Sequence, residues 1–174
     1  MMDEKSTEGI CEEAEFNRVF RANSKDLFNF LYFKYRDEDE ARDMVQEAFG
    51  KLWENCSKVT MDKARGFLFV VANNLMKNIL SKKVTASKHV PVLMKVDRNI
   101  ENPQYQMEVS EFESRLNQAL SELPENQRVT LLLKRIEGKK HKEIAEMLGI
   151  TEKAVEKRLY IAMSTLKEKL GDFL

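Results

Sequence analysis

Hydrophobic residues recur along this chain mostly at intervals of three and four positions. The clearest run lies in the first half and consists of Ala41, Met44, Val45, Ala48, Phe49, Leu52 and Trp53. This spacing places the apolar side chains on one side of an α-helix, and we expect Phe49, Leu52 and Trp53 to be core residues. The 174 residues include six glycines and three prolines, and no proline precedes Pro91. Because a β-sandwich or barrel needs many turns, the chain is predicted to be all-α.

Four helices are predicted in the first half. A short apolar stripe marks the first helix, and Ser24 is placed to cap a second helix with its own apolar side. These two stripes are Phe16, Val19 and Phe20, and then Leu27, Phe28, Leu31 and Tyr35. Asp37, followed three residues later by Glu40, has the spacing of a capping box at the start of the third helix. The fourth begins near Asp62, and because these stripes need one another to leave water, a compact bundle is predicted over residues 10–83.

The apolar pattern is lost over residues 84–108, which contain Pro91 and Pro103 and only isolated apolar residues. We interpret this segment as a flexible linker. Ser110, with Glu113 three residues later, has the spacing of another capping box and is expected to begin a second helical domain over residues 109–174. The sequence therefore predicts two small helical domains joined by a linker.

The second domain is predicted to contain a helix-turn-helix. Pro124 suits the first turn of one helix, where its missing N–H costs nothing, and Gly138 is placed to end that helix. Gly149 permits the positive φ of a tight turn between the last two helices, and Thr151 can cap the second of them. The wedge between these helices is filled by Ile144, Leu148, Ile150, Val155 and Leu159. The last helix can enter a DNA major groove, although two packed helices with no role in DNA binding remain an alternative.

The charge of the chain is balanced overall but unevenly distributed. It has 29 basic and 29 acidic residues, yet residues 59–95 contain seven basic residues and one acidic residue. A basic block beside an acidic one suggests two different partners, one of them polyanionic, although solvated surface would look the same. The longest stretch without Asp, Glu, Lys or Arg is Gly66 to Met76, shorter than the roughly 20 residues that a transmembrane helix needs. The charged N-terminus has no apolar core like that of a signal peptide, so we expect a cytoplasmic protein without direct membrane insertion.

No constellation of residues indicates an enzyme. The two histidines, His89 and His141, lie far apart, and neither has a partner at metal-ligand spacing. No glycine loop of the phosphate-binding kind is present, so neither a metal nor a cofactor is expected. Two cysteines cannot make a disulfide framework, and we expect Cys11 and Cys56 to be inert thiols in a reducing compartment, with a redox-sensing pair as the less favoured alternative.

Two sets of motifs resemble those of bacterial sigma factors. The first set is Asp43-Met44-Val45-Gln46-Glu47-Ala48-Phe49 with Leu52-Trp53, followed by Ala72-Asn73-Asn74-Leu75, and it looks like region two of that family. The second set is Leu123-Pro124-Glu125-Asn126-Gln127-Arg128, Glu137-Gly138 and Glu143-Ile144-Ala145, and it looks like region four. The large middle region of housekeeping sigma factors is absent. The chain therefore resembles the small extracytoplasmic-function group of sigma factors.

The resemblance implies three binding surfaces. The third helix would dock on the clamp helices of RNA polymerase core through Asp43, Gln46 and Glu47. The fourth helix would read the promoter −10 element through Asn74, Lys77, Asn78, Lys82 and Lys83, because amides can pair with exposed base edges and lysines with phosphates. The second domain would read the −35 element through Lys134, Lys153, Glu156, Lys157, Arg158 and Tyr160.

The resemblance also implies partners: RNA polymerase core, contacted at its clamp helices and flap, promoter DNA and an anti-sigma factor. The function implied is that of a sigma factor that directs the polymerase to promoters and assists strand opening. One alternative is a stand-alone helix-turn-helix regulator that binds duplex DNA, which leaves the motif from Asp43 to Trp53 unexplained. Another is an interaction protein whose helical halves only dock partners and bind no DNA.

Overall fold

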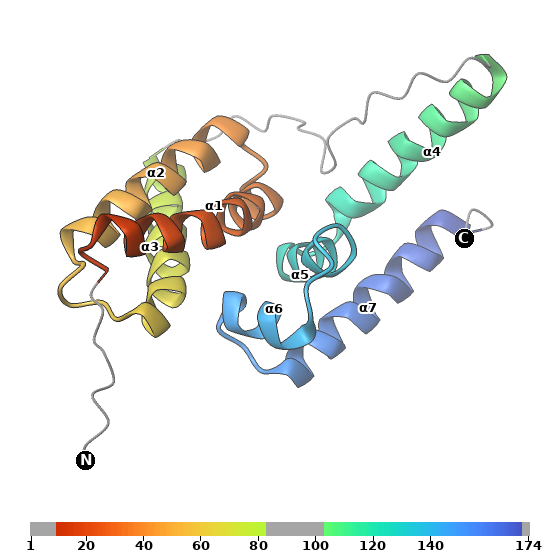
Figure 1. Cartoon of the computed structure of the whole chain (residues 1–174). Helices are drawn as coiled ribbons and strands as arrows, with labels where there is room; N and C mark the ends of the chain where they lie inside the picture. Colours follow the sequence, from red (N-terminus) through yellow and green to blue (C-terminus); the bar gives the residue numbers. More distant parts are fainter. Residues whose placement is uncertain (1–9, 83–102, 172–174) are drawn as a thin grey trace. The chain divides into compact units, whose positions relative to one another are not determined.

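The structure is a computed structural model that describes residues 10–82 and 103–171, and in these residues it contains seven α-helices and no strand. The helices are α1 (Glu13–Tyr35), α2 (Glu38–Glu54), α3 (Met61–Lys82), α4 (Pro103–Glu122), α5 (Glu125–Arg135), α6 (His141–Leu148) and α7 (Glu152–Leu170) (Figure 1). The chain divides into two compact units, residues 1–87 and 88–174. The prediction of an all-α chain with two helical parts is confirmed.

The first unit is built by α1, α2 and α3, which pack against one another in pairs. Its core contains leucines from all three helices, and Leu27, Leu31, Leu52 and Leu68 are each completely buried. Each buried leucine stabilises the unit by about 1.5–3 kcal/mol relative to an exposed one. The apolar sides of the three helices thus cover one another, and their polar sides remain available for partners.

The helix break predicted at Ser24 was wrong, because α1 runs without interruption from Glu13 to Tyr35. Val19, Asn23 and Leu27 follow one another at intervals of four and are all buried, so the two predicted stripes are one stripe. Asn23 is accommodated in this stripe because its Nδ2 donates a hydrogen bond to the carbonyl oxygen of Val19 at 2.9 Å. Ser24 therefore lies inside the helix, where its hydroxyl caps nothing.

The turn between α1 and α2 is sharp and well defined by hydrogen bonds. Arg36 ends α1 in the left-handed conformation, with a φ of 58°, and its N–H donates to the carbonyl of Tyr32 at 2.8 Å. This conformation costs a non-glycine residue about 1–2 kcal/mol. Asp37 then caps α2, since its Oδ1 accepts from the N–H of Glu40 at 3.1 Å. The predicted cap at Asp37 is confirmed.

The second unit contains α4 to α7, with Leu133, Ile144 and Val155 completely buried. Its first helix begins at Pro103, so the predicted start at Ser110 was wrong and Ser110 lies inside α4. Proline is favoured at the first position of a helix because no intrahelical bond needs its N–H. The sequence pattern places Pro103 in the linker, whereas the structure places it at the start of α4.

The next helix boundaries of this unit lie close to the positions predicted from the sequence. Pro124 is the N-cap of α5, one residue before the predicted first turn, and Gly138 follows the helix with a φ of 64°.

The ends of α4 and α7 are joined by a hydrogen bond and ion pair from Lys169 Nζ to Glu122 Oε2. That bond, with a second one from Gln118, lowers the pKa of the Glu122 carboxyl. The contact holds the last turn of α7 against α4.

The two cysteines are joined by a disulfide, so the expectation of two inert thiols was wrong. Cys11 precedes α1 and Cys56 lies in the loop between α2 and α3, 45 positions apart in the sequence. Their Cα atoms are 5.0 Å apart. The bundle of the first unit brings them together, and nothing in their sequence spacing indicates the pairing.

Candidate nucleic-acid interface

The helix-turn-helix is formed by α6 and α7 with a tight turn at Gly149. Gly149 has a φ of 64°, and the next residue, Ile150, donates its N–H to the carbonyl of Ala145 at 3.0 Å. Thr151 caps α7, because its hydroxyl oxygen accepts from the N–H of Ala154 at 3.2 Å. The predicted roles of Gly149 and Thr151 in forming the turn are confirmed.

The start of α6 is stabilised differently from a typical capped helix. Its N-cap residue, Lys140, contributes no side-chain hydrogen bond, because an ammonium group has no acceptor. Glu143 compensates, since its Oε2 accepts from the backbone N–H of Lys140 at 2.8 Å. A carboxylate at this position also suits the positive end of the helix dipole.

One side of α7 faces solvent and bears most of the residues expected to contact the −35 element. Lys153, Glu156, Lys157 and Tyr160 are all exposed, and 78% of the Tyr160 surface is accessible. An aromatic ring so exposed contributes little to folding and is available to a partner. Arg158 is half-buried and lies at the edge of this surface. The helix presents two lysines, a tyrosine and a carboxylate within two turns.

Glu156 has a neighbour that sequence reasoning did not identify. The Oε1 atom of its carboxylate lies 3.7 Å from Nδ1 of His141, the first residue of α6. This distance is too long for a hydrogen bond, but the two groups form an ion pair when the imidazole is protonated. The carboxylate therefore lies beside the start of α6 as well as on the exposed side of α7.

Lys134, the remaining residue expected to contact the −35 element, lies in the last turn of α5 and not on α7. Both helices belong to the second unit. Lys134 is half-buried, and a cation in the last turn also suits the negative end of the helix dipole. Its position thus has a structural reason in addition to the predicted phosphate contact.

The exposed side of α3 bears the residues expected to contact the −10 element. Asn74 and Asn78 are four positions apart and both exposed, and Lys77 lies between them and is exposed as well. The side chain of Lys82 and the whole of Lys83 lie outside the described residues. Two amides and a lysine on one side of a helix can bind unpaired bases and the backbone that carries them.

Asn73 belongs to the same surface, although sequence reasoning did not place it there. Its Oδ1 accepts from Lys34 Nζ at 2.7 Å and from Tyr35 Oη at 2.8 Å, and both donors come from the end of α1. Because an ammonium group can only donate, the amide oxygen must face Lys34, and its NH₂ group points away from both donors. No sequence signal links residues so far apart, since the packing of α1 on α3 brings them together.

The residues expected to bind polymerase are accessible on α2. Asp43, Gln46 and Glu47 are exposed, whereas Met44 and Val45 beside them are buried in the first unit. This arrangement gives α2 an acidic outer side on an apolar support. Such a surface suits a basic helical partner.

Aromatic residues extend this outer surface at the junction of α1 and α2. Phe49 and Leu52 are buried as predicted, but Trp53 is 47% exposed, so its assignment to the core was wrong. The Trp53 ring contacts Phe16 edge-on, with centroids 5.1 Å apart, and Phe20 is 41% exposed beside Phe49. An indole at the end of the stripe keeps one face on its neighbours and the other in solvent.

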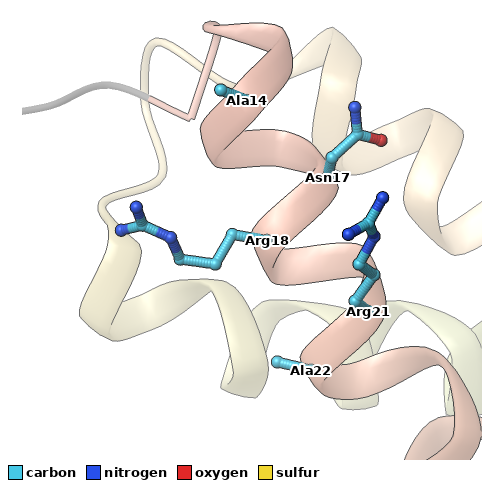
Figure 2. Close-up of a pocket in the computed structure, with 5 residues that line it drawn as sticks. All are labelled: Ala14, Asn17, Arg18, Arg21 and Ala22. Carbon is cyan, nitrogen blue, oxygen red and sulfur yellow. The ribbon is translucent and has the colours of Figure 1, made fainter.

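The outer side of α1 carries a shallow hollow lined by Ala14, Asn17, Arg18, Arg21 and Ala22 (Figure 2). Arg18 pairs with Glu15 at 3.0 Å. The lining offers cationic and small side chains and none of the carboxylates, thiols or imidazoles that acid–base or nucleophilic catalysis uses.

Among the helices of the described residues, none is both long enough and apolar enough to cross a membrane.

Comparison with known proteins places both units in one family. A family model described as "Sigma-70 region 2" matches residues 19–85, and one described as "Sigma-70, region 4" matches residues 113–166. A relative from Bacillus subtilis (strain 168), the "ECF RNA polymerase sigma factor SigM", is 26% identical over 154 residues, which cover 87% of this chain and 92% of the relative.

Two solved structures share the fold. One is the sigma factor RpoE in complex with the anti-sigma factor NepR from Bartonella quintana, with a TM-score of 0.63, 18% identity and coverage of 92% of this chain and 99% of that chain. The other is CnrH in complex with the cytosolic domain of CnrY, with a TM-score of 0.59, 21% identity and coverage of 94% and 92%. Because models of sigma-70 region 2 and region 4 both match this chain, and a relative named as an ECF sigma factor aligns with 87% of it, the chain belongs to the sigma-70 family and is an extracytoplasmic-function sigma factor that directs RNA polymerase.

Proposed function

We propose that the two units divide promoter recognition between them. In this proposal residues 10–83 dock on the clamp helices of RNA polymerase core and read the −10 element, residues 84–102 link the units, and residues 103–174, which begin with α4, bind the flap and read the −35 element. The observation that supports it most is the pair of exposed polar surfaces on α3 and α7, one in each matched region.

The chemistry of each surface suits its proposed ligand. Asn74 and Asn78 can donate to and accept from the edges of unpaired bases, and Lys77 can contact the phosphates of the same strand. On α7, Lys153 and Lys157 suit the backbone of duplex DNA, and Glu156 can accept from the exocyclic amine of a cytosine. The remaining residues proposed for these contacts are Lys82 and Lys83 at the −10 element and Lys134, Arg158 and Tyr160 at the −35 element.

The chain supplies specificity and strand opening in this proposal, while the polymerase core catalyses RNA synthesis. It acts in the cytoplasm, where promoter DNA and the core enzyme are found. One solved structure described above is a sigma factor in complex with an anti-sigma factor, and the other is CnrH in complex with the cytosolic domain of CnrY. We therefore include an anti-sigma factor among the proposed partners.

Reversing the charge of the α2 surface tests the docking step. The double variant Asp43→Lys with Glu47→Lys should lose most of its co-purification with core polymerase, because like charges then face the basic partner. The matched control is Glu38→Lys with Glu168→Lys, which changes the net charge equally at two exposed positions outside the proposed surface. Equal retention of polymerase by both variants, with normal circular dichroism, would show that the docking surface lies elsewhere.

A further inference from the structure

The disulfide between Cys11 and Cys56 ties the segment before α1 to the loop between the two helices that carry the proposed surfaces of the first unit. Cys56 belongs to the loop of residues 55–60, which joins α2, the proposed docking helix, to α3, the proposed −10 helix. Cys11 is exposed and Cys56 half-buried, so small molecules in solution can reach the bond. These are the only two cysteines in the chain, so neither has another partner within it.

Hydrogen bonds order part of the short loop on which the disulfide acts. Within it, Val59 donates its N–H to the carbonyl of Asn55 at 3.1 Å, and Asn55 Nδ2 donates to the carbonyl of Lys51 at 2.8 Å. Ser57 and Lys58 remain exposed at the tip. A covalent bond at Cys56 ties this loop to the segment before α1 and restricts its movement.

Contacts close in sequence to the two cysteines anchor their segments to the first unit. Ile10, directly before Cys11, is completely buried, and the ring of Phe16, which follows Cys11, contacts that of Trp53, which precedes Cys56. Two thiols held in this way have a high effective concentration for each other, so the bond can form again after reduction. The helical core of the unit contains the completely buried Leu27, Leu31, Leu52 and Leu68, which come from α1, α2 and α3 and not from the segments that carry the cysteines.

We propose that Cys11 and Cys56 form a reversible dithiol–disulfide site that controls the loop of residues 55–60 and, through it, opening of the promoter. The proposal rests on the function proposed above, in which the chain works in a reducing compartment. Disulfides in such compartments are mostly transient and redox-sensing. The oxidised form restrains the loop, and the reduced form leaves it free to move as α3 takes up the unpaired strand.

The chemistry requires an oxidant and a reductant of common classes. One thiolate attacks hydrogen peroxide, which gives a sulfenic acid and releases hydroxide, and the hydroxide is then protonated to water. The second thiolate attacks that sulfur, the S–S bond forms and a second water leaves, so two thiols and one peroxide give one disulfide and two waters. A dithiol reverses the process by attacking the bond, passing through a mixed disulfide and leaving as its own disulfide while both cysteines regain protons.

The test compares the two redox states of the full chain with core polymerase. Promoter fragments are first selected from a randomised library with the Cys11→Ser, Cys56→Ser double variant, so that the choice of DNA does not depend on redox state. Permanganate reactivity near the start site then measures opening by wild-type protein treated with hydrogen peroxide or with dithiothreitol, and non-reducing gels verify the state of the pair. We expect the oxidised protein to open the promoter several-fold less, to recover with dithiothreitol and to bind core polymerase equally well.

The serine variants distinguish a redox switch in this chain from peroxide damage to the polymerase and from a purely structural bond. The double serine variant should open the promoter like the reduced protein in both treatments, which controls for oxidation of the polymerase's own cysteines. Equal opening by oxidised and reduced wild-type protein, or equal peroxide sensitivity of the serine variant, would overturn the proposal. Loss of helical circular dichroism on reduction would also overturn it, because the bond would then be a structural requirement. If no chain-dependent initiation occurs in either state, the proposed function itself fails.

Discussion

The ion pair between Arg65 and Asp26 joins α3 to α1, and its removal gives a measurable prediction. Arg65 Nη2 donates to Asp26 Oδ2 at 3.1 Å, Nη1 donates to Asn23 Oδ1 at 3.2 Å, and the guanidinium lies over the ring of Phe69 at 5.4 Å. The Asp26 side chain is 11% exposed and that of Arg65 is 30% exposed. Replacing Asp26 by alanine leaves a half-buried cation whose main counter-charge is gone.

The expected loss in free energy of unfolding follows from how deeply the ion pair is buried. Removing one partner of a fully buried ion pair costs about 3–5 kcal/mol, whereas an exposed pair contributes about 0–1 kcal/mol. Since Asp26 is nearly buried and Arg65 is a third exposed, we expect Asp26→Ala to lower the free energy of unfolding of the first unit by about 2 kcal/mol. With an m-value of about 1.5–2 kcal/mol per molar urea, the midpoint should fall by about 1 M.

Urea unfolding followed by tryptophan fluorescence measures this in the intact protein. Trp53 is the only tryptophan in the chain and lies in the first unit, so its emission reports that unit alone. The control is Glu38→Ala, which removes the exposed pair with Arg42 on α2 and should cost only a few tenths of a kcal/mol. A midpoint shift for Asp26→Ala no larger than that for Glu38→Ala would refute the reasoning.

Three further predictions concern the proposed DNA surfaces and the core of the second unit. Asn74→Ala with Asn78→Ala should reduce permanganate-detected opening near the start site, whereas Lys157→Ala should reduce protection of the upstream element; equal loss of upstream protection in both would contradict the division of roles. Glu156→Ala should relax discrimination at one upstream base pair by about 1–3 kcal/mol if the carboxylate accepts from a cytosine, and a promoter library with single-base changes measures it; a flat response at every position would leave Glu156 as helix surface. Ile144→Ala, at a completely buried position, should destabilise the second unit by about 2–5 kcal/mol in thermal unfolding followed by circular dichroism, and a cost below 1 kcal/mol would mean that the packing of α6 is misassigned.

Features decided by local chemistry could be predicted from the sequence. Gly149 and Thr151 form the turn and cap that their residue types indicate, because positive φ and hydroxyl capping depend on immediate neighbours. Ser24 was misassigned because a serine can cap a helix or lie within one, and the buried stripe along α1 decides between them. The pairing of Cys11 with Cys56 depends on how three helices pack, which no local pattern contains.

In the candidate site too, local features could be predicted from the sequence, whereas contacts between helices could not. The exposed side of α7 follows from helical spacing, so the accessibility of Lys157 and Tyr160 could be predicted. The orientation of Asn73 could not, because Lys34 and Tyr35 reach it from another helix. Helical periodicity determines which side of a helix is polar, while tertiary packing determines which neighbour each polar group meets.

The central claim is that this chain recognises promoters as a part of RNA polymerase and does not act alone. Transcription from a library of randomised promoter fragments, with core polymerase and with or without the purified chain, tests it most directly. The account predicts chain-dependent transcripts whose templates share two separate blocks of constrained bases, and weak binding of the same fragments by the chain alone, since its basic and acidic residues balance at 29 each. Tight, sequence-specific binding by the free chain at physiological salt, with no chain-dependent transcripts, would contradict the account and favour a stand-alone regulator.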